Sequence, residues 1–221
     1  MRLCVTNIVA GAPAEHAITK ANHAAYAARI GADYCPVYLP APATAGRAKA
    51  CSWKYAAADV AAQYTLTLYL DCDCVVTRLC PSFHTAVPPG HWGVVDELCV
   101  ITNAAKASVE TVQAINWGAQ PWTLNAGVMI MPSDAKKVYK SELITEHWLN
   151  DQAALSARLY RGEAKYRLID RRWNWSFMHP YFLTGLEFAY IIHRAGQPIF
   201  TPLGGVEQQY RGLERDIQAY G

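Results

Sequence analysis

Charged residues are scarce in this chain of 221 residues: Asp, Glu, Lys and Arg make up 17% of it, whereas hydrophobic residues make up 52%. This composition excludes intrinsically disordered and charge-rich fibrous proteins, which cannot bury enough apolar surface. The formal net charge is +2 at pH 7, and basic residues never gather beyond pairs such as Lys136-Lys137 and Arg171-Arg172. The charge pattern therefore favours neither a nucleic-acid partner nor a membrane surface, and the length suits one globular domain.

Long apolar runs and paired cysteine motifs are also missing. Charged or proline residues interrupt every candidate stretch of 18 residues, so the sequence predicts no transmembrane segment. The apolar run near the beginning is too short for a secretory signal. The seven cysteines are odd in number and form no Cys-x-x-Cys pair, which is typical of buried, reduced thiols. We therefore expect a soluble, cytoplasmic protein.

Strand and helix patterns alternate along the chain, which is typical of an α/β protein with a mostly parallel sheet. In the first half, we expect strands at residues 3–9, 33–39 and 65–76, with alanine-rich helices at 15–30 and 48–63 between them. In the second half, we expect strands at 93–101 and 124–131, helices at 133–143 and 145–160, and a last helix after Gly204-Gly205.

An acidic pair follows the clearest strand pattern, TLTLYLDCDCVV. If the strand stays extended, the two-residue period puts Asp71 and Asp73 on the same face, opposite three leucines. Two neighbouring carboxylates repel each other unless a cation lies between them, and hard oxygen ligands suit Mg²⁺ or Mn²⁺. The end of a strand in an open α/β sheet is also where ligands bind. The pair therefore indicates a metal and phosphate site, and a solvated turn is the alternative.

Two chemistries use such a triplet. In a metal-dependent sugar transferase, the ion offsets the charge of a departing diphosphate. In a phosphatase of the haloacid dehalogenase type, the first Asp attacks phosphorus. Those phosphatases normally begin with this strand and need a later acidic pair, whereas here a long segment precedes the strand and no Asp-Asp pair follows it.

An ordered series of motifs resembles the GT-A glycosyltransferases, specifically glycosyltransferase family 8, which includes glycogenin and bacterial lipopolysaccharide galactosyltransferases. The segment RAKACSW followed by YLDCDCVV resembles the Lys-containing helix that leads into the Asp-x-Asp strand of this family. LNAGVMIMPS resembles the FNSGVMV segment, with Ala126 in place of Ser. NDQAAL, Asn174 in RRWNW, and IIHRAGQP resemble later elements in the same order. The series extends from residue 3 to about residue 200.

The resemblance implies a role for particular residues. Asp71, Asp73 and His193 match the metal ligands, and this mixed set suits Mn²⁺ or Mg²⁺. Gln152, Asp151 and Asn125 match the groups around the transferred sugar, with the Gln152 amide facing the anomeric carbon. Contacts with the nucleotide-sugar fall on Thr6, Asn7, Lys49, Asp71, Cys72, Asp73, Asn125, Ala126, Gly127, Asp151, Gln152, His193 and Gly196.

Plain structural roles are the alternatives for several of these residues. Thr6 and Asn7 can be an ordinary strand end, Lys49 and Arg47 can be surface residues of a helix, and Gly127 can mark a strand bulge. As a functional residue, Gly127 would let the backbone approach the sugar.

One basic residue of the family is missing. The late Lys that contacts the diphosphate falls where this chain reads Arg194-Ala195-Gly196-Gln197-Pro198, and Arg194 is an offset substitute. Tryptophans gather in the second half, where Trp173 and Trp175 flank Asn174. Indole rings suit the apolar faces of sugars, so we expect one of this pair on the acceptor side, with core packing as the alternative.

Taken together, the sequence predicts a single GT-A domain over residues 1–221. Its Rossmann-like, mostly parallel sheet carries a nucleotide-sugar half (1–100) and a smaller acceptor half (101–221). The expected activity is transfer of a hexose from a UDP-sugar donor to a carbohydrate or other hydroxyl acceptor, with retention of configuration. The alternatives are the phosphatase and an inactive sugar-nucleotide-binding domain.

Overall fold

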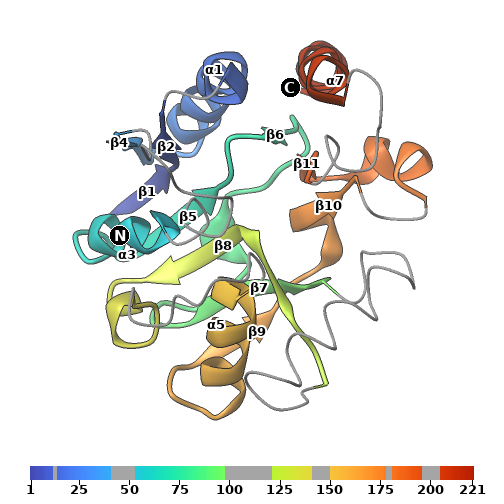
Figure 1. Cartoon of the computed structure of the whole chain (residues 1–221). Coiled ribbons are helices and arrows are strands. Elements are labelled where there is room, and N and C mark those ends of the chain that lie inside the picture. The colour runs from blue at the N-terminus through green and yellow to red at the C-terminus, as the bar shows by residue number, and fades with distance from the viewer. Residues whose placement is uncertain (12–13, 41–52, 98–120, 141–149, 178–180, 196–204) are drawn as a thin grey trace.

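A mixed six-stranded sheet forms the centre of the computed structural model, which describes residues 1–11, 14–40, 53–97, 121–140, 150–177, 181–195 and 205–221 (Figure 1). Its order is β3-β1-β5-β8-β7-β9. The bounds are β1 (Leu3–Thr6), β3 (Asp33–Tyr34), β5 (Leu66–Leu70), β7 (Trp92–Asp96), β8 (Leu124–Pro132) and β9 (Tyr166–Leu168). β8 runs antiparallel to β5 and β7, whereas the other pairs are parallel. The expected mostly parallel sheet is confirmed.

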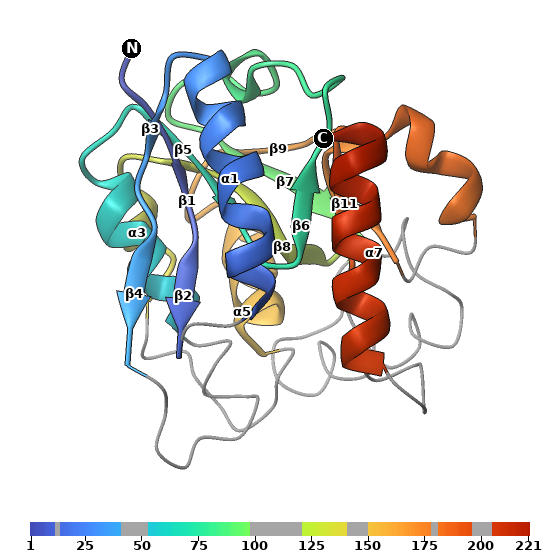
Figure 2. The same ribbon diagram turned by 90° about the horizontal axis from the view of Figure 1, so that it is seen from above.

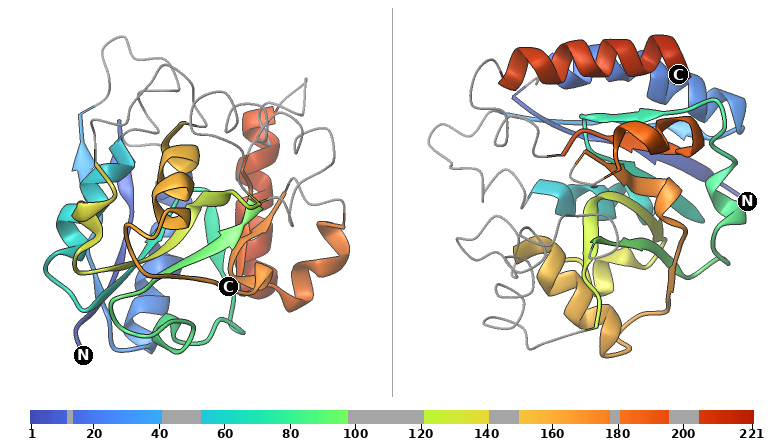
Figure 3. Two further views of the ribbon diagram at one scale, coloured as in Figure 1. Left: turned by 90° about the horizontal axis from the view of Figure 1, so that it is seen from below. Right: turned by 90° about the vertical axis from the view of Figure 1, so that its right-hand side faces the viewer.

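Helices cover both faces of this sheet. Helix α1 (Ala14–Arg29) packs on one face, and α7 (Gly205–Tyr220) lies beside α1 and packs on β6 (Cys74–Val76) of a smaller sheet (Figure 2). Helix α5 (Asn150–Tyr160) lies on the opposite face, where it packs on β8 (Figure 3). The short helix α3 (Ala56–Ala61) also packs on that side, against the core shared with α5. None of the helices in the described parts of the chain has the length and apolar character of a membrane span.

The central strand β5 is buried on both faces because helices cover both. Leu66, Leu68 and Leu70 belong to the core beneath α1, whereas Tyr69 belongs to the core shared with α3 and α5. This is the alternation that the sequence predicts. The end of β5 therefore emerges between two packed layers.

Two smaller sheets flank the centre. The first has the order β10-β11-β6, with β10 (Trp175–Ser176), β11 (Ile191–His193) and β6 (Cys74–Val76). The second pairs β2 (Ile8–Ala10) with β4 (Val37–Leu39). The short 3-10 helices are η1 (Trp53–Tyr55), η2 (Phe83–Thr85), η4 (Ala135–Lys137), η6 (Arg171–Asn174) and η7 (Leu183–Phe188).

Several expected strands are split between sheets. The expected strand at 65–76 ends at Leu70, because residues 71–73 form a turn after which β6 joins β11 in another sheet. The expected strands at 3–9 and 33–39 are likewise each divided in two, as β1 with β2 and β3 with β4. Within residues 93–101, β7 ends at Asp96, and residues 98–101 lie outside the described parts.

The expected helix at 133–143 is wrong for its described part. Only η4 forms there, followed by one bond from the Tyr139 N–H to the Ala135 carbonyl. The side chain of Asp134 does not cap the start of this segment. At its end, the Val138 carbonyl accepts a hydrogen bond from the Arg158 guanidinium of α5 rather than from a following helical turn. The other helices occur as α1, α5 and α7, and the helix at 48–63 as η1 with α3; residues 48–52 and 145–149 lie outside the described parts.

Candidate functional site

The Asp-x-Asp turn lies beyond the carboxyl end of β5 and is held by three elements. The Asp71 N–H donates to the Gly127 carbonyl of β8 (2.8 Å), and the Thr19 hydroxyl of α1 donates to the Cys72 carbonyl (2.9 Å). The Arg194 N–H, directly after β11, donates to the Asp73 carbonyl (3.1 Å). The carboxylates of this turn are therefore presented by a fixed backbone.

A cleft of about 240 Å³ opens beside the turn. Polar groups and a few apolar ones line it: Ile8, Ala10, Glu15, Lys54, Tyr69, Asp71, Cys72 and Asp73. It occupies the place where open α/β sheets bind ligands. Burial raises the pKa of the Glu15 carboxyl in this cleft, and the Asp73 carboxylate adds to that effect.

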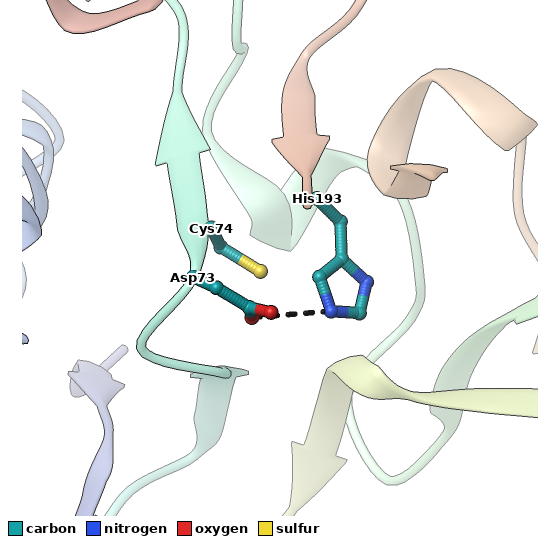
Figure 4. A group of neighbouring side chains, drawn as sticks. All are labelled: Asp73, Cys74 and His193. Carbon is teal, nitrogen blue, oxygen red and sulfur yellow. Dashed lines mark ion pairs between the residues drawn. The ribbon is translucent and has the colours of Figure 1, made fainter. Parts of the chain in front are cut away.

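His193 faces both carboxylates because β11 pairs with β6 in a register that opposes His193 and Cys74. Its Nε2 lies 3.3 Å from Asp73 Oδ1 (Figure 4). The same nitrogen lies 3.8 Å from Asp71 Oδ2. Strands from distant parts of the sequence thus bring together the three side chains that the sequence predicts as metal ligands.

Burial and charge act in opposite directions on this pair. Burial disfavours the His193 imidazolium, but the Asp73 carboxylate outweighs it and raises the pKa of His193. Burial likewise disfavours the Asp73 carboxylate, but His193 outweighs it and lowers the pKa of Asp73. The site therefore favours a positive charge between its carboxylates, which is what a cation site requires.

The tautomer of His193 follows from its neighbours. The Gly127 N–H donates to Asn125 Oδ1 (2.9 Å), and so does the Asn174 amide nitrogen (2.9 Å). Asn174 therefore turns its own oxygen toward His193 Nδ1, 2.9 Å away, and that nitrogen carries the proton. A bond of this kind leaves Nε2 as the ligand atom of a metal-binding histidine.

Gly127 makes room for the imidazole. A Cβ atom at this position would lie 2.0 Å from His193 Cε1 and 2.7 Å from Nε2. No side chain fits there unless the ring moves. The structure thus explains why glycine occurs at position 127 by the space that His193 needs, which differs from the close approach to a sugar expected from the sequence.

Lys54 is a basic residue that the sequence analysis missed. Its ammonium donates to Asp71 Oδ2 (2.8 Å) and to the Ala126 carbonyl (3.3 Å). The Tyr69 hydroxyl donates to the other Asp71 oxygen (2.5 Å). Lys54 directly follows the RAKACSW segment that contains Lys49, and this position is the signal that could have found it.

Cys74 also lies close to the candidate ligands. Its sulfur, an Asp73 oxygen and a His193 nitrogen lie within 4.8 Å of one another (Figure 4). Burial raises the pKa of the Cys74 thiol well above its ordinary value, so the sulfur stays protonated and contacts the Gly127 carbonyl at 3.8 Å. The carboxylates and the imidazole are the better ligands, because metals bind the thiolate.

Asn125 and Gln152 meet at a further buried carboxylate, that of Glu97. Glu97 accepts from the Asn125 amide (2.9 Å) and from the Gln152 amide. Burial raises the pKa of Glu97 to about 7, although both amide donors counteract it. The only hint of Glu97 in the sequence is its position in an acidic pair after a strand.

Asp151 has an unused buried oxygen. The residue is 7% exposed, and its Oδ2 has no hydrogen-bond partner within the described parts of the chain. Burial raises the pKa of Asp151 to about 6, and Lys54 partly offsets this. A buried carboxylate oxygen without a partner is costly, so it suits a group that receives hydroxyl donors from a ligand.

Other expected site residues lie elsewhere or outside the described residues. The Thr6 hydroxyl donates to the Cys35 carbonyl (2.6 Å), and the Asn7 amide donates to the Leu70 carbonyl (2.7 Å), so both side chains bond within the protein. Arg47, Lys49 and Gly196 lie outside the described parts.

Two expectations for the second half need correction. Arg194 does not point to a diphosphate, because its guanidinium forms a buried two-point pair with Asp216 of α7, at 2.8 and 3.0 Å. Trp173 and Trp175 are core residues, only 3% and 6% exposed. Trp175 donates its indole N–H to the Phe182 carbonyl, and Trp173 packs edge-on against Tyr190.

The chain resembles known proteins in fold rather than in sequence. No protein-family model and no curated protein matches it. A glycosyltransferase involved in the glycosylation of the major capsid of PBCV-1 superposes with a TM-score of 0.63 at 17% identity, covering 97% of this chain and 100% of that one. The galactosyltransferase LgtC, in complex with donor and acceptor sugar analogs, superposes with a TM-score of 0.54 at 13% identity, covering 97% and 95%.

These matches define the fold class. The protein has the GT-A fold of the glycosyltransferases to which its structure is similar. The expected α/β architecture and the resemblance in fold to glycosyltransferases such as LgtC are thereby confirmed.

Proposed function

We propose that the protein is a retaining glycosyltransferase that moves a hexose from a UDP-sugar to a hydroxyl acceptor. The convergence of Asp71, Asp73 and His193 beside the cleft at the end of β5 carries this proposal. The GT-A fold supports it, and it favours a transferase over the phosphatase alternative. The site draws on both expected halves of the chain, since Asp71 and Asp73 precede residue 100 and Asn125, Gln152 and His193 follow it.

A divalent ion, Mn²⁺ or Mg²⁺, fits this donor set. Two carboxylates and an imidazole nitrogen face one another, and the bond from His193 Nδ1 to Asn174 directs Nε2 toward the carboxylates. Asp71, Asp73 and His193 would hold the ion, and Lys54 would share Asp71 with it. Bound there, the ion would supply positive charge to a departing diphosphate.

The remaining groups would bind and orient the donor sugar. The Asp151 Oδ2 atom, which has no partner among the described residues, would accept hydrogen bonds from sugar hydroxyls, and Asn125 and Gln152 would add neutral amides. We place the Gln152 amide opposite the leaving group, as the resemblance implies. An amide is a poor nucleophile, so this placement favours a front-side displacement with retention over a double displacement through a covalent intermediate. The acceptor hydroxyl would then attack from the face that UDP leaves, and a departing phosphate oxygen would take its proton.

Thermal unfolding with a panel of nucleotides and UDP-sugars, each with and without Mn²⁺, tests the donor site. A ligand at 100 times its Kd adds about 2.7 kcal/mol to the free energy of unfolding. In a domain of this size that raises Tm by about 5–10 °C. We expect a shift with UDP and with one UDP-sugar that depends on Mn²⁺.

Asp73→Asn, which removes one proposed ligand, should abolish that shift, whereas Asp134→Asn should keep it. Asp134 is a matched control because it pairs with Lys137 on the surface. No shift of the wild type with any nucleotide, or an undiminished shift in Asp73→Asn, would contradict the proposed site. A retained anomeric configuration in the NMR spectrum of the product would then test the stereochemistry.

A further inference from the structure

Glu97 is a buried carboxylate that forms no ion pair with a Lys, Arg or His among the described residues. It directly follows β7, is 5% exposed, and its N–H bonds to the Thr123 carbonyl next to β8 (2.6 Å). Its two side-chain oxygens have different donors: Oε1 accepts from Asn125 Nδ2 at 2.9 Å, and Oε2 accepts from Gln152 Nε2. One carboxylate thus joins two residues that are 27 positions apart in the sequence.

The chemistry of these bonds fixes both amides. Glu97 accepts hydrogen bonds from both amide NH₂ groups, so both NH₂ groups face its carboxyl group. Both amide oxygens are therefore turned away from it. At a pH above the pKa of Glu97, about 7, this acceptor is charged, and donation to a charged group is stronger than donation to a neutral one.

The two amides differ in the number of further hydrogen bonds that fix their orientation. Asn125 Oδ1 also accepts from the Gly127 N–H and from Asn174, so its orientation is fixed from both ends. The Gln152 side chain makes no hydrogen bond other than the one to Glu97 within the described parts of the chain. Among the described residues, Glu97 is therefore the one that orients the Gln152 amide.

We propose that Glu97 is a positioning residue, which holds the Gln152 amide so that its oxygen, rather than its NH₂ group, is offered to the donor sugar. This inference rests on the proposed function. It assigns a role to a carboxylate that lies behind the sugar-binding residues and acts through one of them.

The isosteric change Glu97→Gln tests this role. The new amide oxygen can accept from Asn125, but its NH₂ group would meet the NH₂ group of Gln152, so the Gln152 amide must flip. We expect kcat for hydrolysis of the UDP-sugar that gives the largest thermal shift to fall by about 10²–10³-fold, as when one oriented polar group is lost. The Kd of UDP with Mn²⁺, measured by calorimetry, should change by less than about threefold, because the metal ligands are untouched.

A double-mutant cycle separates positioning from general destabilisation. If Glu97 acts through Gln152, Glu97→Gln should cost little further activity once Gln152 is replaced by Ala. Thr77→Val is the matched control, because it also removes one buried hydrogen bond, from the Thr77 hydroxyl to the Ala189 carbonyl. It should lower Tm without the loss of kcat.

The possible outcomes separate this inference from the function on which it rests. Wild-type kcat in Glu97→Gln, or losses that multiply fully in the double variant, would overturn the role of Glu97 while leaving the transferase intact. A wild type that binds no UDP with any divalent ion would overturn the function itself. If Glu97→Gln does not fold, Gln152→Met must show the same loss of kcat, and full activity in that variant overturns the proposal.

Discussion

Adding a single methyl group at Gly127 should disable the candidate metal site. In Gly127→Ala, the new Cβ would lie 2.0 Å from His193 Cε1 and within 2.8 Å of both ring nitrogens. The ring cannot simply turn aside, because His193 is 2% exposed and bonds to Asn174 through Nδ1. We therefore expect the imidazole to leave its position facing Asp71 and Asp73.

The size of this effect follows from two terms. Overpacking in a well-packed interior costs about 1–3 kcal/mol, and the loss of a buried hydrogen bond adds about 1 kcal/mol. The free energy of unfolding should fall by about 2–4 kcal/mol, which lowers Tm by about 5–15 °C in a domain of this size. The free energy of Mn²⁺ binding should fall by more than the free energy of unfolding, because one of three proposed ligands is displaced.

Urea unfolding and Mn²⁺ calorimetry on Gly127→Ala measure both effects. Gly93→Ala is the control: Gly93 lies in β7 of the same sheet, and its new Cβ would crowd Val87 and Ile130 rather than His193. The cost of Gly127→Ala should also shrink in a His193→Ala background, where the ring is absent. Wild-type Mn²⁺ affinity in Gly127→Ala, or a cost that is the same in both backgrounds, would refute this reasoning.

Two further predictions concern buried charges. Asp216→Asn leaves the buried Arg194 guanidinium without its charged partner, so the free energy of unfolding should fall by about 3–5 kcal/mol in urea; a loss below about 1 kcal/mol would contradict this. Burial raises the pKa of Glu97 to about 7 from an ordinary 4.5, so between these pH values the folded state keeps a proton that the unfolded chain releases. Wild-type stability should therefore fall by up to about 3 kcal/mol as the pH rises through this range. Glu97→Gln should lack this contribution, and an unchanged pH dependence of urea unfolding would contradict it.

Periodicity in the sequence predicted the parts of the fold that depend on local pattern. The alternation around Leu68 and Tyr69 predicted a strand with the leucines on one face, and the alanine-rich segment before Gly31 predicted the helix that occurs as α1. The break in the strand after Leu70 could not be predicted. It occurs because the following residues form β6, which pairs with β11 in another sheet, more than 100 residues later in the sequence. Long-range pairing of this kind has no local signal.

The candidate site was predictable where chemistry gathers in a short motif. The position of Asp71 and Asp73 as a pair after a strand indicates a metal site, and the resemblance of the segment around His193 to a family motif indicates the third ligand. Lys54 was missed because the family resemblance assigned the basic position to Lys49, and only the fold brings Lys54 to Asp71. Glu97 was missed because only the fold brings it to Asn125 and Gln152.

The most direct measurement is the release of UDP from UDP-sugars by the wild type and by Asp73→Asn, with and without Mn²⁺. We expect the wild type to hydrolyse one UDP-sugar only when Mn²⁺ is present. In Asp73→Asn the rate of hydrolysis should fall about 10²-fold or more, which corresponds to a loss of several kcal/mol of transition-state stabilisation. A wild type that binds UDP but hydrolyses no UDP-sugar and transfers none would be an inactive binding domain. Equal hydrolysis by Asp73→Asn would show that the Asp-x-Asp turn is not the catalytic site.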